Sequence, residues 1–165
     1  MATTTSFRDL TARDVMTNDV VTAHPSWSIE RLADFFMEYD ISGAPVTDDD
    51  GDLVGVVSMS DITQHSSLPG ESLPRPRPHQ QFHLGIDSEY SDEDLESFRE
   101  QEWGGATVDD IMTPMVFDVS EDAPLETIAD TMLKGRIHRV LVTRKKQLVG
   151  IITALDLIRV IRDAS

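Results

Sequence analysis

The feature that most constrains the fold of this chain is an internal repeat of about fifty residues. Residues 14–17 (DVMT) return as 110–113 (DIMT), and residues 55–61 (GVVSMSD) return as 150–156 (GIITALD). The second copy lies 96 positions further on at its start and 95 at its end, so one residue is lost in between. Because apolar positions are kept throughout the match, the repeat indicates duplication of one structural unit.

Both copies have the same order of predicted elements, strand-helix-strand-strand-helix. Short branched or aromatic runs predict the strands, and the third strand of each copy is apolar almost throughout, as in strands buried on both faces. Helix start signals place Ser28 as the N-cap of the first helix in one copy and Asp122 in the other. The strands are expected at residues 20–23, 44–47 and 53–58, and again at 116–119, 140–143 and 148–153. Hairpin turns are expected at residues 48–52 and 144–147, and closing helices that begin at Asp61 and Asp156.

One such unit is too small to bury its own sheet. We therefore predict a mixed α/β (α+β) fold in which two β-α-β-β-α repeats pack together with pseudo-twofold symmetry. The repeats are expected at residues 9–64 and 106–162. Residues 65–105 interrupt them as an acidic, proline-rich linker, with a helix predicted near residues 91–103 from a serine cap followed by acidic residues.

The charge and the composition exclude several classes of protein. Thirty acidic and fourteen basic side chains give a net charge of −16, which repels nucleic acids and anionic membranes. The chain has no cysteine, so it can form neither a disulfide nor a cysteine zinc site. No apolar run approaches the roughly 18 residues of a membrane span, and the N-terminus lacks a secretory signal. We expect a cytoplasmic protein.

The duplicated motifs resemble those of a known family. The paired DVMT and DIMT segments, the strand entry at residues 41–46 (ISGAPV) and the two Gly-x-x-Ser/Thr-x-x-Asp endings are similar to tandem cystathionine-β-synthase (CBS) domains, also called a Bateman module. The resemblance covers about two thirds of the chain and includes small stand-alone CBS-pair proteins. It implies a regulatory, non-catalytic module that binds AMP, ADP, ATP or S-adenosylmethionine between the repeats. It also implies a homodimer and a regulated partner protein, which the sequence does not identify.

The residue types at the repeated endings suit an adenosine ligand. Asp61 and Asp156 can accept both ribose hydroxyls, and Ser58 and Thr153 can donate to a phosphate beside a helix N-terminus. Branched side chains such as Val21 can pack on the adenine ring. The alternative for both aspartates is a helix-capping role, and the two roles are compatible.

The resemblance groups the candidate ligand-binding residues into two clefts, each drawing on both repeats. One cleft combines Thr153, Asp156 and Ile152 with Thr17, Val21, Thr22, Ser42, Gly43 and Ala44. The other combines Ser58, Asp61 and Val57 with Thr113, Phe117, Asp118, His138, Arg139 and Val140.

The two clefts are not expected to be equivalent. His138 and Arg139 stand where the first repeat has Ser42 and Gly43, and the planar guanidinium of Arg139 suits phosphate oxygens. The other reading of this pair is a solvated strand edge, and the cleft that Arg139 serves is left open. Asp118 replaces Thr22 and adds a carboxylate that would repel a polyphosphate, so occupation of one cleft or of both is also open.

Other functions have weaker support in the sequence. The chain has no P-loop, nucleophile elbow or His-Glu-x-x-His motif, so we expect no catalytic residue, no catalytic cofactor and no metal site. His79 and His83 have a metal-compatible spacing but follow several prolines, and residues 48–52 are too short for a calcium loop. The remaining alternative is a structural dimerisation or protein-interaction module with empty clefts.

Overall fold

The computed structural model describes residues 9–66, 103–114 and 116–163. The predicted helix near residues 91–103 lies outside this part of the chain, apart from Trp103. The described residues form two compact units, one within residues 21–116 and the other within residues 1–20 and 117–165. We call them the first-repeat unit and the second-repeat unit and describe each by itself.

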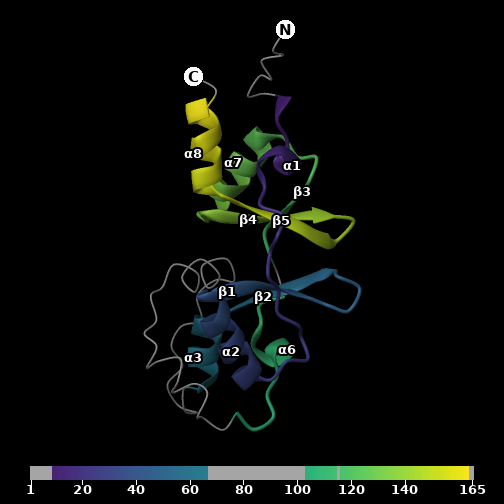
Figure 1. Ribbon diagram of the computed structural model, residues 1–165, viewed down its shortest axis with the longest axis vertical. Coiled ribbons are helices and arrows are strands. Elements are labelled where there is room, and N and C mark those ends of the chain that lie inside the picture. The colour runs from purple at the N-terminus through teal and green to yellow at the C-terminus, as the bar shows by residue number, and fades with distance from the viewer. Residues whose placement is uncertain (1–8, 67–102, 115, 164–165) are drawn as a thin grey trace. The chain divides into compact units, whose positions relative to one another are not determined.

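The first-repeat unit is a two-stranded hairpin covered by helices on one side (Figure 1). The strands β1 (Gly43–Thr47) and β2 (Leu53–Ser58) are antiparallel, with Gly43 opposite Ser58. The helices are α2 (Ile29–Tyr39), α3 (Met59–Ser66) and the single turn α6 (Val108–Ile111).

The core of the first-repeat unit lies between the hairpin and α2. One face of α2 is apolar, and its residues Leu32 and Phe36 are fully buried beside Val57 of β2. Helix α2 begins as predicted, because the Ser28 side chain accepts a hydrogen bond from the Arg31 backbone N–H at 3.2 Å. It ends at Asp40, whose left-handed backbone (φ 52°) allows its N–H to reach the last carbonyl groups of the helix.

The second-repeat unit has the same plan with a larger sheet. Strand β3 (Asp118–Ser120) runs parallel to β4 (Arg139–Arg144), and β4 is antiparallel to β5 (Gln147–Thr153). The helices α1 (Ala12–Val15), α7 (Leu125–Gly135) and α8 (Ala154–Asp163) lie on one side of this sheet (Figure 1). The predicted mixed α/β class and the predicted second and third strands are confirmed in both units.

Three local predictions were wrong. In place of the first strand of the first repeat, the structure has a single bridge between Ala23 and Val46. Two backbone hydrogen bonds join Ala23 to β1 there. Its counterpart in the second repeat begins at Asp118, two residues later than expected. The cap of α7 is Pro124 rather than Asp122, and no side chain caps this helix.

Each unit also contains a short segment from the other repeat, which we call its arm. The arm of the second-repeat unit is residues 11–17, and that of the first-repeat unit is residues 107–113. Thr17, at the start of the first repeat, exchanges two backbone hydrogen bonds with Ile151 of β5, at 2.9 and 3.0 Å. Thr113, at the start of the second repeat, does the same with Val56 of β2, at 2.8 and 2.9 Å. Neither sheet is therefore completed by its own repeat alone.

The repeated glycines allow these arms to approach. A Cβ atom on Gly150 would lie 2.5 Å from the Met16 sulfur, and one on Gly55 would lie 2.7 Å from the Thr113 carbonyl oxygen. The Met16 side chain is flexible and can move aside, whereas the Thr113 carbonyl is fixed by its bond to Val56.

Replacing each glycine by alanine tests this difference. We expect Gly55→Ala to lower the free energy of unfolding by about 1–3 kcal/mol, because the backbone of the arm must shift. Gly150→Ala should cost clearly less, since only the Met16 side chain must repack. Urea denaturation of both variants at one pH measures the difference. Equal losses in the two variants would show that backbone approach is not the constraint at Gly55.

Candidate functional site

The candidate site in each unit is the junction where the last strand enters the closing helix. Helices α3 and α8 begin two residues earlier than predicted, so Asp61 and Asp156 are the third residues of their helices. The Ser58 backbone N–H and hydroxyl both donate to Oδ2 of Asp61, at 2.7 and 3.0 Å. The Thr153 backbone N–H and hydroxyl donate in the same way to Oδ2 of Asp156, both at 2.8 Å.

The same arrangement opens the two short helices of the arms. Asp14 accepts from the backbone N–H and the hydroxyl of Thr11, and Asp110 accepts from those of Thr107. All four sites share the spacing Ser/Thr-x-x-Asp, so this hydrogen-bonding pattern is a helix-start device of the fold. It does not by itself identify a ligand site.

Burial distinguishes Asp61 from the arm carboxylates. The hydrogen bonds from Thr11 hold the pKa of the exposed Asp14 below its usual value, and those from Thr107 do the same for the pKa of Asp110. Asp61 accepts equivalent bonds, but it is only 5% exposed, and burial raises its pKa to about 6. The loss of solvation therefore outweighs the two hydrogen bonds at Asp61.

Asp156 is less deeply buried than Asp61 and has a cation beside it. Its Oδ1 lies 3.6 Å from Nη1 of Arg159, three residues further along α8. The first repeat has Gln64 at the matching position. Arg159 was not among the predicted site residues, although its spacing of three residues from Asp156 on a helix is a usable signal.

Other hydrogen bonds engage the donors at this junction. The hydroxyls of Ser58 and Thr153 donate to their aspartates, and their donation to a phosphate stays a prediction. At the start of α8, the Ala154 N–H donates to the His138 carbonyl, and the Asp156 N–H donates to the Thr153 hydroxyl at 3.3 Å. Two amides of this helix start are thus already bonded, which favours guanidinium groups over the helix N-terminus as phosphate ligands.

The strand entries lie beside the aspartate junction of their own repeat. Gly43 pairs with Ser58 across β1 and β2, and Arg139 pairs with Thr153 across β4 and β5. Arg139 therefore belongs to the same unit as Asp156, whereas the sequence analysis grouped it with Asp61. The predicted clefts combine residues of both units, and that grouping stays a prediction.

Several predicted ligand-binding residues are part of the hydrophobic cores. The side chains in question are fully or almost fully buried among apolar neighbours, so they support the junctions from within. They are Ala44, Val57, Val140 and Ile152. Thr113 is also buried and takes part through its backbone, as Thr17 does, whereas Phe117 is 41% exposed.

Asp118 and Thr22 occupy matching positions with different partners. The Thr143 hydroxyl donates to Asp118 Oδ2 at 2.7 Å, and the Thr47 hydroxyl donates to the Thr22 hydroxyl oxygen at 3.1 Å. The Asp118 carboxylate is therefore held along the sheet by Thr143. The repulsion predicted between Asp118 and a phosphate stays a prediction.

A hydrogen-bonded chain of Ser26, His24 and Asp49 resembles a catalytic triad. His24 Nδ1 lies 2.7 Å from the Ser26 hydroxyl, and His24 Nε2 lies 3.0 Å from Asp49 Oδ1. However, Asp49 is 95% exposed, and the Ser26 N–H also donates to His24. The second repeat has the same turn with Ser120 in place of the histidine. We interpret this chain as a stabilised turn.

The remaining alternative sites have no support within the described segments. Residues 48–52 form the predicted hairpin turn, in which Asp48 accepts from the N–H groups of Asp50 and Asp52. No cluster of three or more metal-ligating side chains occurs in residues 9–66, 103–114 and 116–163, and His79 and His83 lie outside them. Within the same segments, no helix is long and apolar enough to span a membrane.

Comparison with known proteins agrees with the duplicated plan. The family model described as "CBS domain" matches residues 12–67 and 108–163. An uncharacterized protein of Methanocaldococcus jannaschii is 31% identical over 151 residues, covering 88% of each chain. The chloroplastic CBS domain-containing protein CBSX1 of Arabidopsis thaliana is 29% identical over 142 residues, which are 86% of this chain and 58% of that protein.

A solved structure extends this similarity to three dimensions. The crystal structure of CBSX2 in complex with AMP is 26% identical to this chain and has a TM-score of 0.63. The match covers 93% of this chain and 96% of that one. The chain also spans 13% of an inosine-5′-monophosphate dehydrogenase of Nitrosopumilus maritimus. The fold is thus found both in small proteins and within longer enzymes.

The raised pKa of Asp61 predicts how stability depends on pH. The folded state binds its proton more tightly than the unfolded state, so this group contributes stability below about pH 4 that is lost as the pH rises through about 6. The raised pKa corresponds to a contribution of about 3 kcal/mol to the free energy of unfolding at low pH. In urea denaturation, the free energy of unfolding of the wild type should fall between pH 4.5 and 7.5, and Asp61→Asn should remove the part of this fall that Asp61 causes.

Asp14→Asn is the matched control for that measurement. Its carboxylate accepts equivalent hydrogen bonds, from Thr11, but has a lowered pKa, so its contribution is present at neutral pH and is lost only as the pH falls below about 4. Between pH 4.5 and 7.5, Asp14→Asn should therefore leave the pH dependence of stability nearly unchanged. A change as large as that in Asp61→Asn would contradict the role assigned to burial.

Proposed function

Since this chain belongs to the CBS-domain family and carries the domain twice, we propose that it is a non-catalytic regulatory module that binds an adenosine nucleotide and modulates a partner protein. The observation that carries the proposal is the match of both repeats to the CBS-domain model, and the anchored carboxylate after each third strand supplies the candidate ribose acceptor. Similarity to CBSX2, whose structure contains AMP, supports adenosine as the ligand class. AMP, ADP, ATP and S-adenosylmethionine are the candidates, and we infer a cytoplasmic protein.

The proposed chemistry is clearest at Asp156. Thr153 fixes Oδ2 with two hydrogen bonds, so the carboxylate is held in one orientation before a ligand arrives. We propose that Oδ1 accepts a ribose hydroxyl, and that Arg159 moves from Oδ1 toward a phosphate when the ribose binds. A second guanidinium, that of Arg139, extends from the strand paired with Thr153.

The charge of the chain favours a ligand with few phosphates. Thirty acidic side chains oppose each added negative charge, and the candidate cations beside Thr153 and Asp156 are two arginines. AMP, or the sulfonium compound S-adenosylmethionine, fits this balance better than ATP. We expect Asp156 to be occupied before Asp61, since the Asp61 carboxylate is buried and is protonated more readily.

A thermal shift experiment tests the proposal. AMP at a hundredfold excess over its Kd should stabilise the wild type by about 2.7 kcal/mol, because it binds only the folded state. Asp156→Ala should abolish the rise in melting temperature. Asp110→Ala is the matched control, since it removes equivalent hydrogen bonds and one charge from the arm helix of the first-repeat unit and should keep the rise.

Two results would refute nucleotide binding at Asp156. One is the absence of any melting rise with AMP, ADP, ATP and S-adenosylmethionine. The other is an equal loss of the rise in Asp110→Ala, which would assign the effect to helix capping.

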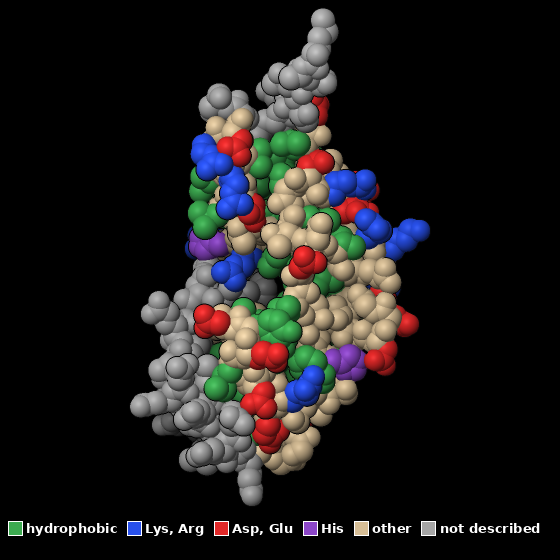
Figure 2. Space-filling model, viewed as in Figure 1, with side chains coloured by type: hydrophobic (Ala, Val, Ile, Leu, Met, Phe, Trp, Pro, Cys, Tyr) green, Lys and Arg blue, Asp and Glu red, His purple; other side chains and the backbone are tan. Residues whose placement is uncertain are grey.

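A second candidate function, dimerisation, is favoured by an exposed apolar surface on α7 and α8. Figure 2 shows hydrophobic side chains at the surface over α8, among charged ones. Leu133 is 75% exposed, Leu155 is 70% exposed and Ile158 is 59% exposed, and Ile161 continues the row. Water-exposed side chains of this size in one row indicate a protein-contact surface.

The first repeat lacks this surface. Leu155, Ile158 and Ile161 correspond to Ser60, Thr63 and Ser66 of α3, which are all hydroxyl residues. The family resemblance implies a homodimer, and we propose one in which two copies of α7 and α8 meet. Helix α8 carries two acidic and two basic residues, so it is locally neutral in a strongly acidic chain.

Exchanging the apolar row for its first-repeat counterparts tests the dimer. The triple variant L155S/I158T/I161S should be monomeric in sedimentation equilibrium at concentrations where the wild type is dimeric. Tyr39→Ser, which removes another exposed large side chain, is the control and should leave the dimer intact. A monomeric wild type, or a dimer that survives the triple substitution, would rule out this interface.

A further inference from the structure

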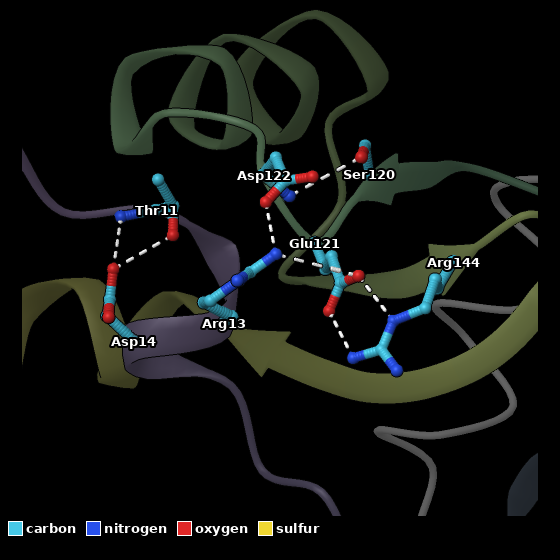
Figure 3. Close-up of polar contacts among 7 residues, drawn as sticks. All are labelled: Thr11, Arg13, Asp14, Ser120, Glu121, Asp122 and Arg144. Atoms are coloured by element: carbon cyan, nitrogen blue, oxygen red, sulfur yellow. Dashed lines mark hydrogen bonds and ion pairs between the residues drawn. The ribbon is translucent and has the colours of Figure 1, made fainter.

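An ion cluster outside the proposed ligand site joins three segments of the second-repeat unit (Figure 3). The guanidinium of Arg144 donates to both carboxylate oxygens of Glu121, through Nε to Oε1 and through Nη2 to Oε2 at 2.6 Å. On the other side, Arg13 Nη2 lies 3.6 Å from Glu121 Oε1 and also donates to Asp122. Glu121 thus lies between a guanidinium of the arm and one of the sheet.

Glu121 differs from its partners in burial. Its side chain is 8% exposed, whereas those of Arg13 and Arg144 are 50% and 59% exposed. The hydrogen bond from Arg144 holds the pKa of Glu121 below its usual value. A carboxylate in this position needs its cations, because removing them would leave a poorly solvated charge.

The cluster holds the arm where the arm meets the sheet. The Arg13 N–H donates to the Glu121 carbonyl at 2.9 Å, and the Ala12 N–H donates to the Ala123 carbonyl at 2.9 Å. Four residues after Arg13, Thr17 makes its two bonds with Ile151, next to Ile152 and Thr153. The arm is therefore attached at two points, and the second point adjoins the proposed ribose site.

The first-repeat unit attaches its arm without charges. The Asp109 N–H donates to the Pro25 carbonyl at 2.9 Å, which is the same backbone bond as that of Arg13. Arg13, Glu121 and Arg144 correspond to Asp109, Pro25 and Asp48, so no ion pair can form there. Buried Val108 and Trp103 pack in this unit, with Trp27 against them. Apolar side chains hold both arms, and among the described residues the arm of the second-repeat unit alone adds this ion cluster.

We propose that Glu121 is a positioning residue, which holds the Thr17 arm on the sheet through Arg13 and Arg144 and makes ligand affinity at Asp156 sensitive to salt. Affinity at Asp61 does not share this sensitivity, because its arm has Asp109, Pro25 and Asp48 in place of the three charged residues of the cluster. The affinity part of this inference rests on the proposed nucleotide function. The arm-holding part does not.

Amide resonances in NMR spectra test both parts in the full chain. Hydrogen exchange at Arg13 and Thr17 should become about threefold to fivefold faster in Arg144→Ala and Glu121→Gln at low salt, the range expected for ion pairs of this exposure. At about 1 M salt, where the Debye length is near 3 Å, the variants and the wild type should converge. Lys145→Ala, which removes a neighbouring charge from the same turn, should exchange like the wild type.

Titration with AMP then tests the positioning role. At low salt, the affinity reported by the Thr153 amide should fall by a similar threefold to fivefold in both variants, whereas that reported by Ser58 should not change relative to the wild type. Arg144→Lys, which keeps the charge but loses the two-point geometry, should restore part of the affinity.

Three results would overturn the inference. Unchanged exchange at Arg13 and Thr17 in both variants would show that the cluster does not hold the arm. Faster exchange with unchanged affinity at Thr153 would show that it does not position the site. An equal loss at Ser58 and Thr153 would indicate a general effect of charge. If AMP binds nowhere in the wild type, the nucleotide proposal fails, and the exchange rates alone decide whether Glu121 holds the arm.

Discussion

The structure depends on a pair of backbone connections in which each repeat completes the sheet of the other. Thr17 bonds to Ile151, and Thr113 bonds to Val56. These bonds satisfy N–H and C=O groups that would otherwise be exposed at the edge of β5 and β2. They also explain why Met-Thr and glycine are repeated together, since the arm can approach the strand only where the strand has no side chain.

The same local motif has different electrostatic properties at different depths. In the part of the chain that the structure describes, the hydrogen-bonded Ser/Thr-x-x-Asp arrangement occurs at four helix starts with nearly equal bond lengths. At the exposed arm helices it stabilises the carboxylate, and at Asp61 the loss of solvent reverses the balance. A duplicated motif therefore need not have a duplicated function. Its chemistry is determined by the residues packed around it, which differ between the two repeats.

Much of this architecture was predictable from the sequence, because the signals were local. Alternating and continuous apolar runs located the second and third strands, and Ser28 marked the start of α2. The N-cap at Asp122 was wrong because the following proline begins α7, and Asp122 bonds to Arg13 instead. That partner lies 109 residues away, so no local pattern indicates it.

The candidate site was predictable in its residue types and less so in its environment. Asp61 and Asp156 were found from the repeat, but their unequal burial depends on packing that the repeat does not encode. Strand pairing places Arg139 opposite Thr153, which the repeat alone does not indicate. The ion cluster at Glu121 was missed because it has no counterpart in the first repeat.

The exchanged arms also affect the order in which the chain can fold during synthesis. Residues 21–116 emerge from the ribosome as one continuous stretch and contain everything that the first-repeat unit needs. The arm at residues 11–17 is made before them, but its partner strand follows some 130 residues later. The apolar residues Leu10, Val15 and Met16 therefore have no core to pack against until β5 has been synthesised.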